Sequence, residues 1–344
     1  MASLAELGKK PLLVIGRAGM DFYADPPGTQ VEHAQRFVAT MGGSSGNIAV
    51  GLVKLGLHVQ LVTSVSDDAV GRFVRNELSR YGVDLRHVTT VSGEARTSLA
   101  VTETRIENTQ NTIYRNGAAD FAMDLDQVDA VDFSAAGGVV VTGTALAAEP
   151  SRSATLAALA HARDAGIPAV LDIDYRPYSW PSGEEAAAVY QMAAALCDTV
   201  VGNDEEFAVM AGEPDGAPFA EQLAQQGRVV VYKMGEKGSL TFAEGARMAT
   251  GIFSVNALKP MGAGDAFMAA FLAGLAEGRG LPEAVERGSA AAALVVSRIG
   301  CAPAMPTRED LDAFIAKAGP VGAFNNRPAR RTATQQLEGD DAKP

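Results

Sequence analysis

Short runs of apolar, mostly β-branched residues alternate with longer segments of helical periodicity along most of this chain. The apolar runs cover 11–16, 59–65, 138–144, 169–175, 199–203 and 228–234. Helical segments follow at 70–82, at 184–197 and at 151–166, where Ser151 is expected to cap the helix and Gly166 to end it. Strands that are apolar on both faces need cover on both sides, so this alternation predicts a mostly parallel sheet between two layers of helices. Ligands of such sheets bind beyond the carboxyl ends of the strands.

Two segments, 17–40 and 96–117, break this rhythm with period-two alternation and polar faces. A small antiparallel sheet that stands off the core would have this pattern. We expect it to act as a lid that excludes water from a reacting site, with a plain edge hairpin as the alternative. Proline, arginine and acidic residues replace the apolar period near residue 320, so we expect one domain over 10–320 and a disordered tail over 321–344.

Composition narrows the class of partner. The chain has 344 residues, 47% of them hydrophobic, which is enough for one large α/β domain or two smaller ones. Its net charge of −12 argues against a nucleic-acid partner, because duplex binding needs a basic face. No stretch is long and apolar enough to span a membrane, and the first ten residues lack the apolar core of a signal peptide. Two cysteines, Cys197 and Cys301, and four scattered histidines offer neither a disulfide framework nor metal-ligand spacing, so we expect a protein of the reducing cytoplasm.

The stretch 259–278 joins a glycine-rich turn to a long apolar helix. Gly262 and Gly264 let the backbone approach a ligand closely, and the first N–H groups of the helix would face an anion such as phosphate. Asp265 could accept a proton from a hydroxyl that attacks this phosphate. A simple glycine turn with Asp265 as a helix cap explains this stretch alone about equally well.

A second glycine cluster, Gly42 and Gly43, precedes another predicted helix. A polar ligand could lie against the bare backbone there, with Asn47 both donating and accepting hydrogen bonds. Taken alone, two glycines before a helix more often form a turn.

The two elements together, GG-x-x-x-N at 42–47 and GAGD at 262–265, are those of a known family. On these motifs the sequence resembles the ribokinase-like sugar kinases, the PfkB family, over roughly residues 10–318. The resemblance implies an α/β fold, a ribokinase-like three-layer sandwich with a mostly parallel central sheet and a small β lid. It also implies a kinase that uses ATP and Mg²⁺ on a small sugar substrate.

The resemblance assigns roles to matching residues. Asp265 matches the catalytic base, and Gly262, Ala263 and Gly264 match an anion hole that stabilises the transferred phosphoryl group. Asn203 and Glu206 match a pair that organises magnesium through water, although a capping pair on a short helix is the alternative. The nucleotide is expected at Lys233, Gly235 and Gly238. The sugar is expected at Asp21, Gly42, Gly43 and Asn47.

One segment departs from the family pattern. Many members carry Asp-Thr-Thr before GAGD, and the aspartate helps to hold a monovalent cation. This chain has Lys259, Pro260 and Met261 there. The departure leaves dependence on potassium open.

The segment 172–180, at the end of a predicted strand, bears on the choice of sugar. Arg176 is suited to a bidentate grip on a carboxylate, and Tyr114 and Arg115 on the lid could close over the same group. Two arginines at one site favour an acidic sugar. The alternative is that Arg176 bridges to a surface carboxylate while Trp180 packs in the core.

Within the family, the sequence resembles the members that phosphorylate the 6-hydroxyl of 5-dehydro-2-deoxy-D-gluconate in myo-inositol catabolism. The same chemistry on 2-dehydro-3-deoxygluconate is the nearest alternative, and a kinase of neutral sugars would leave the arginines without a partner. A non-catalytic sugar or nucleotide sensor on the same fold is an alternative from another class. A dinucleotide-dependent dehydrogenase is disfavoured, because no GxGxxG follows the first predicted strand. Lid strands of relatives often pair across a dimer, so a homodimer through the lid is a further expectation.

Overall fold

The computed structural model describes residue 4, residues 7–319 and residue 321. The tail predicted to be disordered, 321–344, lies outside the described residues except for residue 321. Within the described part, the centre is a nine-stranded sheet in the order β13-β12-β11-β10-β9-β8-β1-β4-β5. Its strands are β1 (Leu12–Ile15), β4 (Val59–Ser66), β5 (Val88–Val91), β8 (Gly138–Thr142), β9 (Ala169–Asp172), β10 (Thr199–Asn203), β11 (Val229–Lys233), β12 (Ser239–Ala243) and β13 (Ala246–Thr250).

The strands from β5 to β11 run parallel, and β12 and β13 add an antiparallel edge. All six predicted strands are present, as β1, β4, β8, β9, β10 and β11. The strands β5, β12 and β13 were missed. The outer two, β5 and β13, each have only one fully buried residue, so they lack the continuous apolar run that marks a buried strand.

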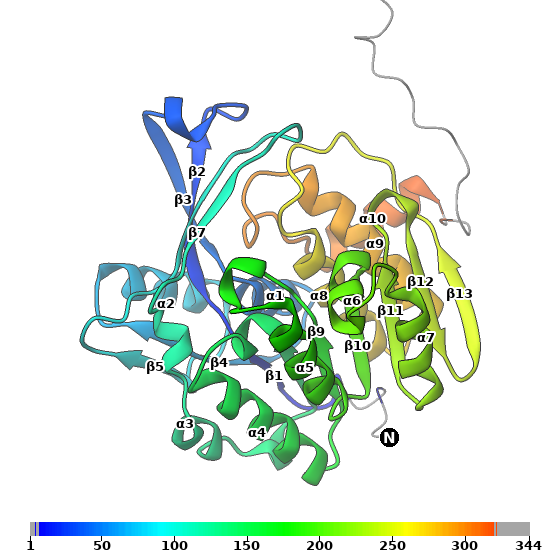
Figure 1. Cartoon of the computed structure of the whole chain (residues 1–344). Coiled ribbons are helices and arrows are strands. Elements are labelled where there is room, and N and C mark those ends of the chain that lie inside the picture. The colour runs from blue at the N-terminus through cyan, green and yellow to red at the C-terminus, as the bar shows by residue number, and fades with distance from the viewer. Residues whose placement is uncertain (1–3, 5–6, 320, 322–344) are drawn as a thin grey trace, which may run out of the picture.

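Helices cover both faces of this sheet (Figure 1). One layer holds α1 (Ser44–Lys54), α2 (Ala69–Tyr81), α8 (Ala263–Ala276), α9 (Leu281–Val296) and α10 (Arg308–Ala318). The other holds α3 (Leu125–Asp129), α4 (Ser151–Asp164), α5 (Gly183–Ala194), α6 (Asp204–Ala211) and α7 (Ala217–Gln225). Successive residues of a strand point to opposite faces, so Leu12 and Val14 join the first core while Leu13 and Ile15 join the second. The predicted three-layer sandwich is confirmed.

The start of α4 differs from the prediction. Ser151 is the first helical residue and Pro150 is the N-cap. The Ser151 hydroxyl donates to the carbonyl oxygen of Ala145 (2.7 Å), so it does not cap the helix. A serine before an apolar run can either cap the helix or bond to an earlier turn. Here the partner is the carbonyl oxygen of Ala145 in the preceding turn, which the sequence pattern does not reveal.

A second, four-stranded sheet forms the lid in the order β3-β2-β6-β7. Its strands are β2 (Gly19–Asp25), β3 (Arg36–Gly42), β6 (Leu99–Thr102) and β7 (Asn111–Tyr114). The outer pairs are antiparallel as expected, but the central β2–β6 pair is parallel, which is possible because a long connection joins these two strands. Figure 1 shows these strands rising away from the central sheet. Tyr23 of β2 ties the lid to the core, with its hydroxyl 3.1 Å from the Cys301 sulfur.

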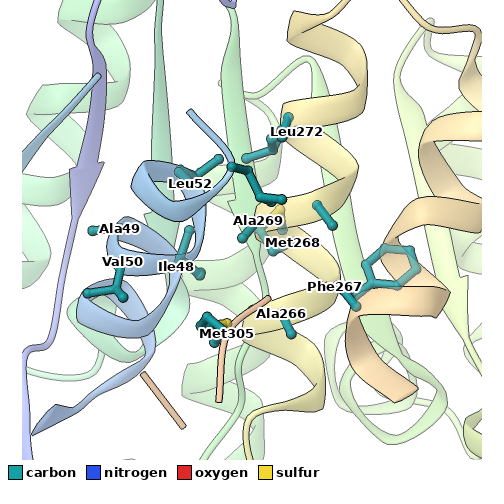
Figure 2. Packing of buried hydrophobic residues seen from close by; sticks show 14 of the residues in the cluster. Ile48, Ala49, Val50, Leu52, Ala266, Phe267, Met268, Ala269, Leu272 and Met305 are labelled. Atoms are coloured by element: carbon teal, nitrogen blue, oxygen red, sulfur yellow. The ribbon is translucent and has the colours of Figure 1, made fainter. Parts of the chain in front are cut away.

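The contact between α1 and α8 positions the most important side chains. Figure 2 shows apolar side chains of the two helices, among them Ile48 and Ala269, packed together. A Cβ added to Gly51 would lie 2.6 Å from the Cβ of Ala269, so the glycine permits a close approach of the helices. Asn47 and Asp265 lie one turn before Gly51 and Ala269, so the same approach brings them together. No helix in the described part is long and apolar enough to cross a bilayer.

Candidate active site

The first turn of α8 carries Asp265, and Asn47 on α1 faces it. Asn47 Nδ2 donates a hydrogen bond to Asp265 Oδ2 at 2.8 Å. The contact joins the two glycine elements across 218 residues of sequence. Asp265 therefore bonds to another helix, which argues against its reading as a cap of its own helix. The hydrogen bond fixes one oxygen of Asp265 near the carboxyl ends of the sheet strands.

The turn before Asp265 presents backbone N–H groups. Gly262 is the N-cap of α8 in the left-handed conformation (φ 84°), and no side chain caps this helix. The first N–H groups of a helix lack partners within it and attract anions. Lys233, at the end of β11, reaches the same place, since a Cβ on Gly264 would lie 3.5 Å from Lys233 Nζ. A lysine above an open helix N-terminus forms a site suited to phosphate.

The two glycines after Lys233 shape the next turn. Gly235 and Gly238 both have positive φ, 56° and 88°. A Cβ on Gly238 would lie 2.2 Å from the carbonyl oxygen of Thr250, whereas one on Gly235 would meet nothing within 4 Å. Gly238 thus serves the close packing of the β-hairpin, and the surface at Gly235 is open.

An acidic cluster that the sequence reasoning did not single out lies beside Lys233. Asp172 ends β9, and Asp174 follows with φ 41°, a conformation unusual for a residue with a side chain. Burial raises the pKa of Asp172 well above its usual range, Lys233 opposes this shift, and Asp174, Glu206 and Asp265 add to it. Buried acids with raised pKa values, one of them in a strained conformation, are a common mark of a functional site. The signal was present in the sequence as two acids two residues apart after an apolar run.

Asn203 and Glu206 form the capping pair that was the alternative to a magnesium role. Asn203 Oδ1 accepts from the Glu206 N–H (2.8 Å), and Glu206 Oε2 accepts from the Asn203 N–H (2.7 Å). Glu206 Oε1 also accepts from the Tyr175 N–H at 3.2 Å. Burial raises the pKa of Glu206, with Lys233 opposing. The described residues contain no group of three or more His, Cys, Asp or Glu side chains placed to hold a metal ion.

Asp21 lies against Gly42 at the base of the lid, and Asn47 follows on α1. A Cβ on Gly42 would lie 2.2 Å from the Asp21 carboxyl, so the glycine makes room for this side chain. Gly43 instead packs against backbone, since its Cβ would lie 2.6 Å from the carbonyl oxygen of Arg17. Asp21 Oδ1 and Asn47 Oδ1 are buried without a hydrogen-bond partner among the described residues. Unpaired buried acceptors are suited to the hydroxyl groups of a sugar, and Asn47 is the side chain that also contacts Asp265.

The two predicted lid residues have different environments. Tyr114 is 61% exposed on β7. Arg115 is buried, donates to Asp120 through Nε and Nη2 and to the carbonyl oxygen of Thr144 (2.9 Å), and stacks over the ring of Phe121. Its Nη1 has no partner among the described residues. Most of the Arg115 guanidinium is thus already used by the protein.

Arg176 lies close to the acidic cluster. Its Nη2 is 2.6 Å from Asp174 Oδ1, and its Nη1 donates to the carbonyl oxygen of Tyr175 (2.9 Å). The side chain is 41% exposed, so its outer edge stays open. The carboxylate that it meets is a buried one rather than the surface partner of the alternative reading, whereas Trp180 does pack in the core.

Arg17, which the sequence reasoning did not single out, is a third arginine of this region. It follows β1, is buried, and donates from Nη1 to Ser98 Oγ (3.0 Å). Burial raises the pKa of the Tyr178 hydroxyl, and Arg176, Arg17 and Arg115 all oppose this shift. The positive charges of these three arginines are therefore all near enough to act on the Tyr178 hydroxyl.

Two carboxyl groups of the site are set to titrate near neutrality. Burial raises the pKa of Asp265 to about 6, Asp174 raises it further, and the Asn47 hydrogen bond and Arg176 oppose the shift. Burial likewise raises the pKa of Asp21 to about 6, with Arg17 and Lys259 opposing. A base whose pKa lies just below working pH is both ionised and effective.

Comparison with known proteins identifies the family. The model of the pfkB carbohydrate kinases matches residues 9–308. The chain belongs to the pfkB family of carbohydrate kinases. A relative from Photobacterium profundum, named 5-dehydro-2-deoxygluconokinase, is 41% identical over 92% of this chain and 98% of its own. A second of the same name, from Geobacillus kaustophilus, is 36% identical over 89% of this chain and 94% of its own.

Solved structures agree with this assignment. A PfkB protein from Polaromonas sp. JS666 has a TM-score of 0.78 and 28% identity, covering 88% of this chain and 99% of its own. A fructokinase double mutant from Vibrio cholerae O395, solved with fructose, ADP and potassium ion, has a TM-score of 0.79 and 25% identity, covering 91% and 99%. The fold is thus ribokinase-like, as the sequence predicted.

Proposed function

We propose that this pfkB kinase transfers the γ-phosphate of ATP to the 6-hydroxyl of 5-dehydro-2-deoxy-D-gluconate. The name shared by its relatives supports the substrate, and the site supports the chemistry. The observation that carries the proposal is the Asn47–Asp265 contact, which sets a carboxylate with a pKa of about 6 beside an open helix N-terminus. A base and an anion site in contact are what phosphoryl transfer to a hydroxyl requires.

Asp265 acts as the base in the reaction. Its carboxylate takes the proton of the sugar hydroxyl as the oxygen–phosphorus bond forms. The bond between the γ-phosphorus and the β–γ bridging oxygen breaks, and ADP leaves with its electron pair. The N–H groups at 262–264 and the ammonium of Lys233 stabilise the charge on the transferred group.

The residues around Glu206 fit magnesium held through water. The site offers oxygen atoms as possible metal ligands, and Asp174 Oδ2 is buried without a hydrogen-bond partner among the described residues. The oxygens of Asn203 and Glu206 already accept backbone N–H groups, so they reach an ion through its water ligands. Mg²⁺, when bound with ATP, would neutralise phosphate charge. A nearby cation would also relieve the repulsion between Asp172, Asp174 and Glu206.

The arginines support an acidic substrate. Arg176 has an open edge, Arg17 lies near Asp21 and Asp265, and Arg115 keeps one buried N–H group unpaired. A carboxylate bound among them would balance their charge. We assign the main grip to Arg176 and Arg17, with Arg115 and Tyr114 closing over the substrate from the lid.

Two further predictions concern the cellular compartment and the oligomeric state. Buried free Cys197 and Cys301 support a role in the cytoplasm. A homodimer through the lid is supported by exposed Phe37 and Val38 on β3, 41% and 46% accessible. Sedimentation of the intact protein tests this, and a monomer at micromolar concentration would refute it.

Identification of the product tests the proposed function. The protein is incubated with Mg-ATP and 5-dehydro-2-deoxygluconate, and phosphorus NMR should show a phosphomonoester coupled to a methylene group, as expected at the 6-position. ATP binding with no phosphorylated sugar would refute the proposal and favour the sensor. A product from 2-dehydro-3-deoxygluconate alone would keep the chemistry and change the substrate.

A further inference from the structure

Lys259 is a buried cation that the proposed reaction does not use. Its side chain has no solvent exposure and is among the largest fully buried ones in the described chain. Its Nζ donates to the carbonyl oxygens of Met261 (2.6 Å) and Val295 (3.3 Å). The described residues provide no carboxylate in ion-pair contact with it. Burying an unpaired ammonium is costly, so its place next to the anion hole needs a physical reason.

The bond to Met261 acts directly on the anion hole. The Met261 carbonyl and the Gly262 N–H belong to one planar peptide unit and point in opposite directions. An ammonium on the oxygen therefore fixes the direction of the Gly262 N–H and polarises it as a donor. Lys259 thus fixes the orientation of the first N–H donor of the anion hole from the side opposite the ligand.

The bond to Val295 fixes this peptide to the body of the protein. Val295 lies in the last turn of α9, where free carbonyls and the helix dipole favour a cation. A Cβ on Gly262 would lie 3.0 Å from Val295 Cγ1, so this helix end packs against the turn. Lys259 thereby joins the turn to the C-terminal end of α9.

The charge of Lys259 also reaches the reacting carboxylates. Burial lowers the pKa of Lys259, whereas Cys301, Asp265 and Asp21 raise it. The attraction is mutual, so the ammonium favours the ionised forms of Asp265 and Asp21. A fixed cation thus serves both the anion hole and the base.

We propose that Lys259 is a positioning residue for phosphoryl transfer, a covalently attached cation that orients the Gly262 N–H and makes turnover independent of added monovalent ions. This inference rests on the proposed function. It gives a definite answer to the question that the sequence 259–261 left open.

The first test needs no variant. Turnover of the wild-type enzyme is measured in potassium, sodium and tetramethylammonium salts at equal ionic strength. Rates within about twofold of one another are expected, because the cation is part of the chain. Activation by potassium of more than about fivefold over tetramethylammonium would overturn the proposal.

The second test compares Lys259→Met with Lys54→Met. Lys54 is a matched control because its Nζ also donates to carbonyl oxygens, of Pro303 (2.9 Å) and Met305 (2.7 Å), at the far end of α1. K259M should lose kcat about 10- to 100-fold with a nearly unchanged KM for the sugar acid, and its acid limb should move to higher pH. K54M should keep its kcat. A K259M enzyme with wild-type kcat and pH profile would overturn the proposal.

A third variant and a binding measurement separate failure of this inference from failure of the proposed function. Lys259→Ala should regain part of its kcat with ammonium or methylammonium, whereas a packing defect would not respond. By calorimetry, K259M should bind ATP about tenfold more weakly than wild type and K54M should not, even if the proposed sugar acid gives no turnover. Equal ATP affinity in all three proteins would contradict the role of Lys259 whatever the substrate.

Discussion

The phosphate side and the sugar side of the proposed site differ in how far the protein already uses their polar groups. On the phosphate side, the α8 N-terminus lacks a side-chain cap and Lys233 Nζ lies above Gly264. On the sugar side, Arg115 is bonded to Asp120 and Arg176 to Asp174. The phosphate side is ready for an anion, whereas the arginines can bind one only in addition to their internal partners. Phosphate binding therefore depends on unpaired backbone N–H groups. Selection of an acidic sugar depends on whether each arginine can bind the substrate while it keeps its partner in the protein.

The largest effect is expected at the base. Asp265→Asn should lower kcat about 10³-fold while ATP binding persists, because proton removal is lost and the amide can still accept from Asn47. Steady-state kinetics and calorimetry measure the two quantities. Asp126→Asn is the matched control, since Asp126 also lies in the first turn of a helix but is exposed on α3. If D265N turned over as fast as wild type, Asp265 would not be the catalytic base.

Arg115→Met separates stability from recognition. The change leaves Asp120 buried without its partner, so the free energy of unfolding should fall by about 3–5 kcal/mol in urea denaturation. The double variant R115M/D120L should recover much of this loss, because no unpaired charge remains. If R115M unfolds like wild type and instead loses affinity for the sugar acid, Arg115 belongs to the open part of the site.

Arg176→Met should act mainly on the substrate, although it also leaves buried Asp174 without its ion-pair partner. A charge-assisted hydrogen bond contributes about 1.5–3 kcal/mol, so kcat/KM for the sugar acid should fall about 10- to 100-fold. Activity on a neutral sugar such as fructose should change far less when it is measured at a pH well above the pKa of Asp265, because Arg176 also lowers that pKa. Arg163→Met, which changes an exposed arginine on α4, is the control. Equal losses for acid and neutral sugar would contradict a carboxylate contact.

The smallest effect is expected in the pH profile. Asp265 must be ionised to accept a proton, and its pKa is raised to about 6, so kcat/KM should be constant above pH 7 and fall about tenfold per unit below pH 6. In Asn47→Leu the lost hydrogen bond should raise this pKa and move the limb to higher pH. If the acid limb of the pH profile of N47L coincided with that of wild type, a group other than Asp265 would control it.

Local patterns predicted much of this molecule. Apolar runs located the parallel strands other than β5, because a strand buried on both faces needs apolar residues on both. Glycines followed by Asp265 pointed to the proposed phosphate side, because backbone conformation and a helix N-terminus are local properties. The same reasoning did not find Arg17, Asp172 or Asp174 as site residues. Their importance depends on neighbours that only the folded sheet brings close.

The arginines show the limit most clearly. Arg115 and Arg176 were both predicted to hold a carboxylate of the substrate, which stays a prediction, and the structure shows that each also pairs with a carboxylate of the protein. Sequence spacing gives the reach of a guanidinium but not its partner. Asn203 and Glu206 show the same ambiguity, since a capping box and a water-mediated magnesium site use the same residue types.

Substrate preference tests the central claim most directly. The ratio of kcat/KM values is measured by ADP release with Mg-ATP and four substrates: 5-dehydro-2-deoxygluconate, 2-dehydro-3-deoxygluconate, ribose and fructose. The account predicts turnover of 5-dehydro-2-deoxygluconate at least about 100-fold above either neutral sugar, as one or two charged contacts would give. Equal or better turnover of ribose or fructose would contradict the account.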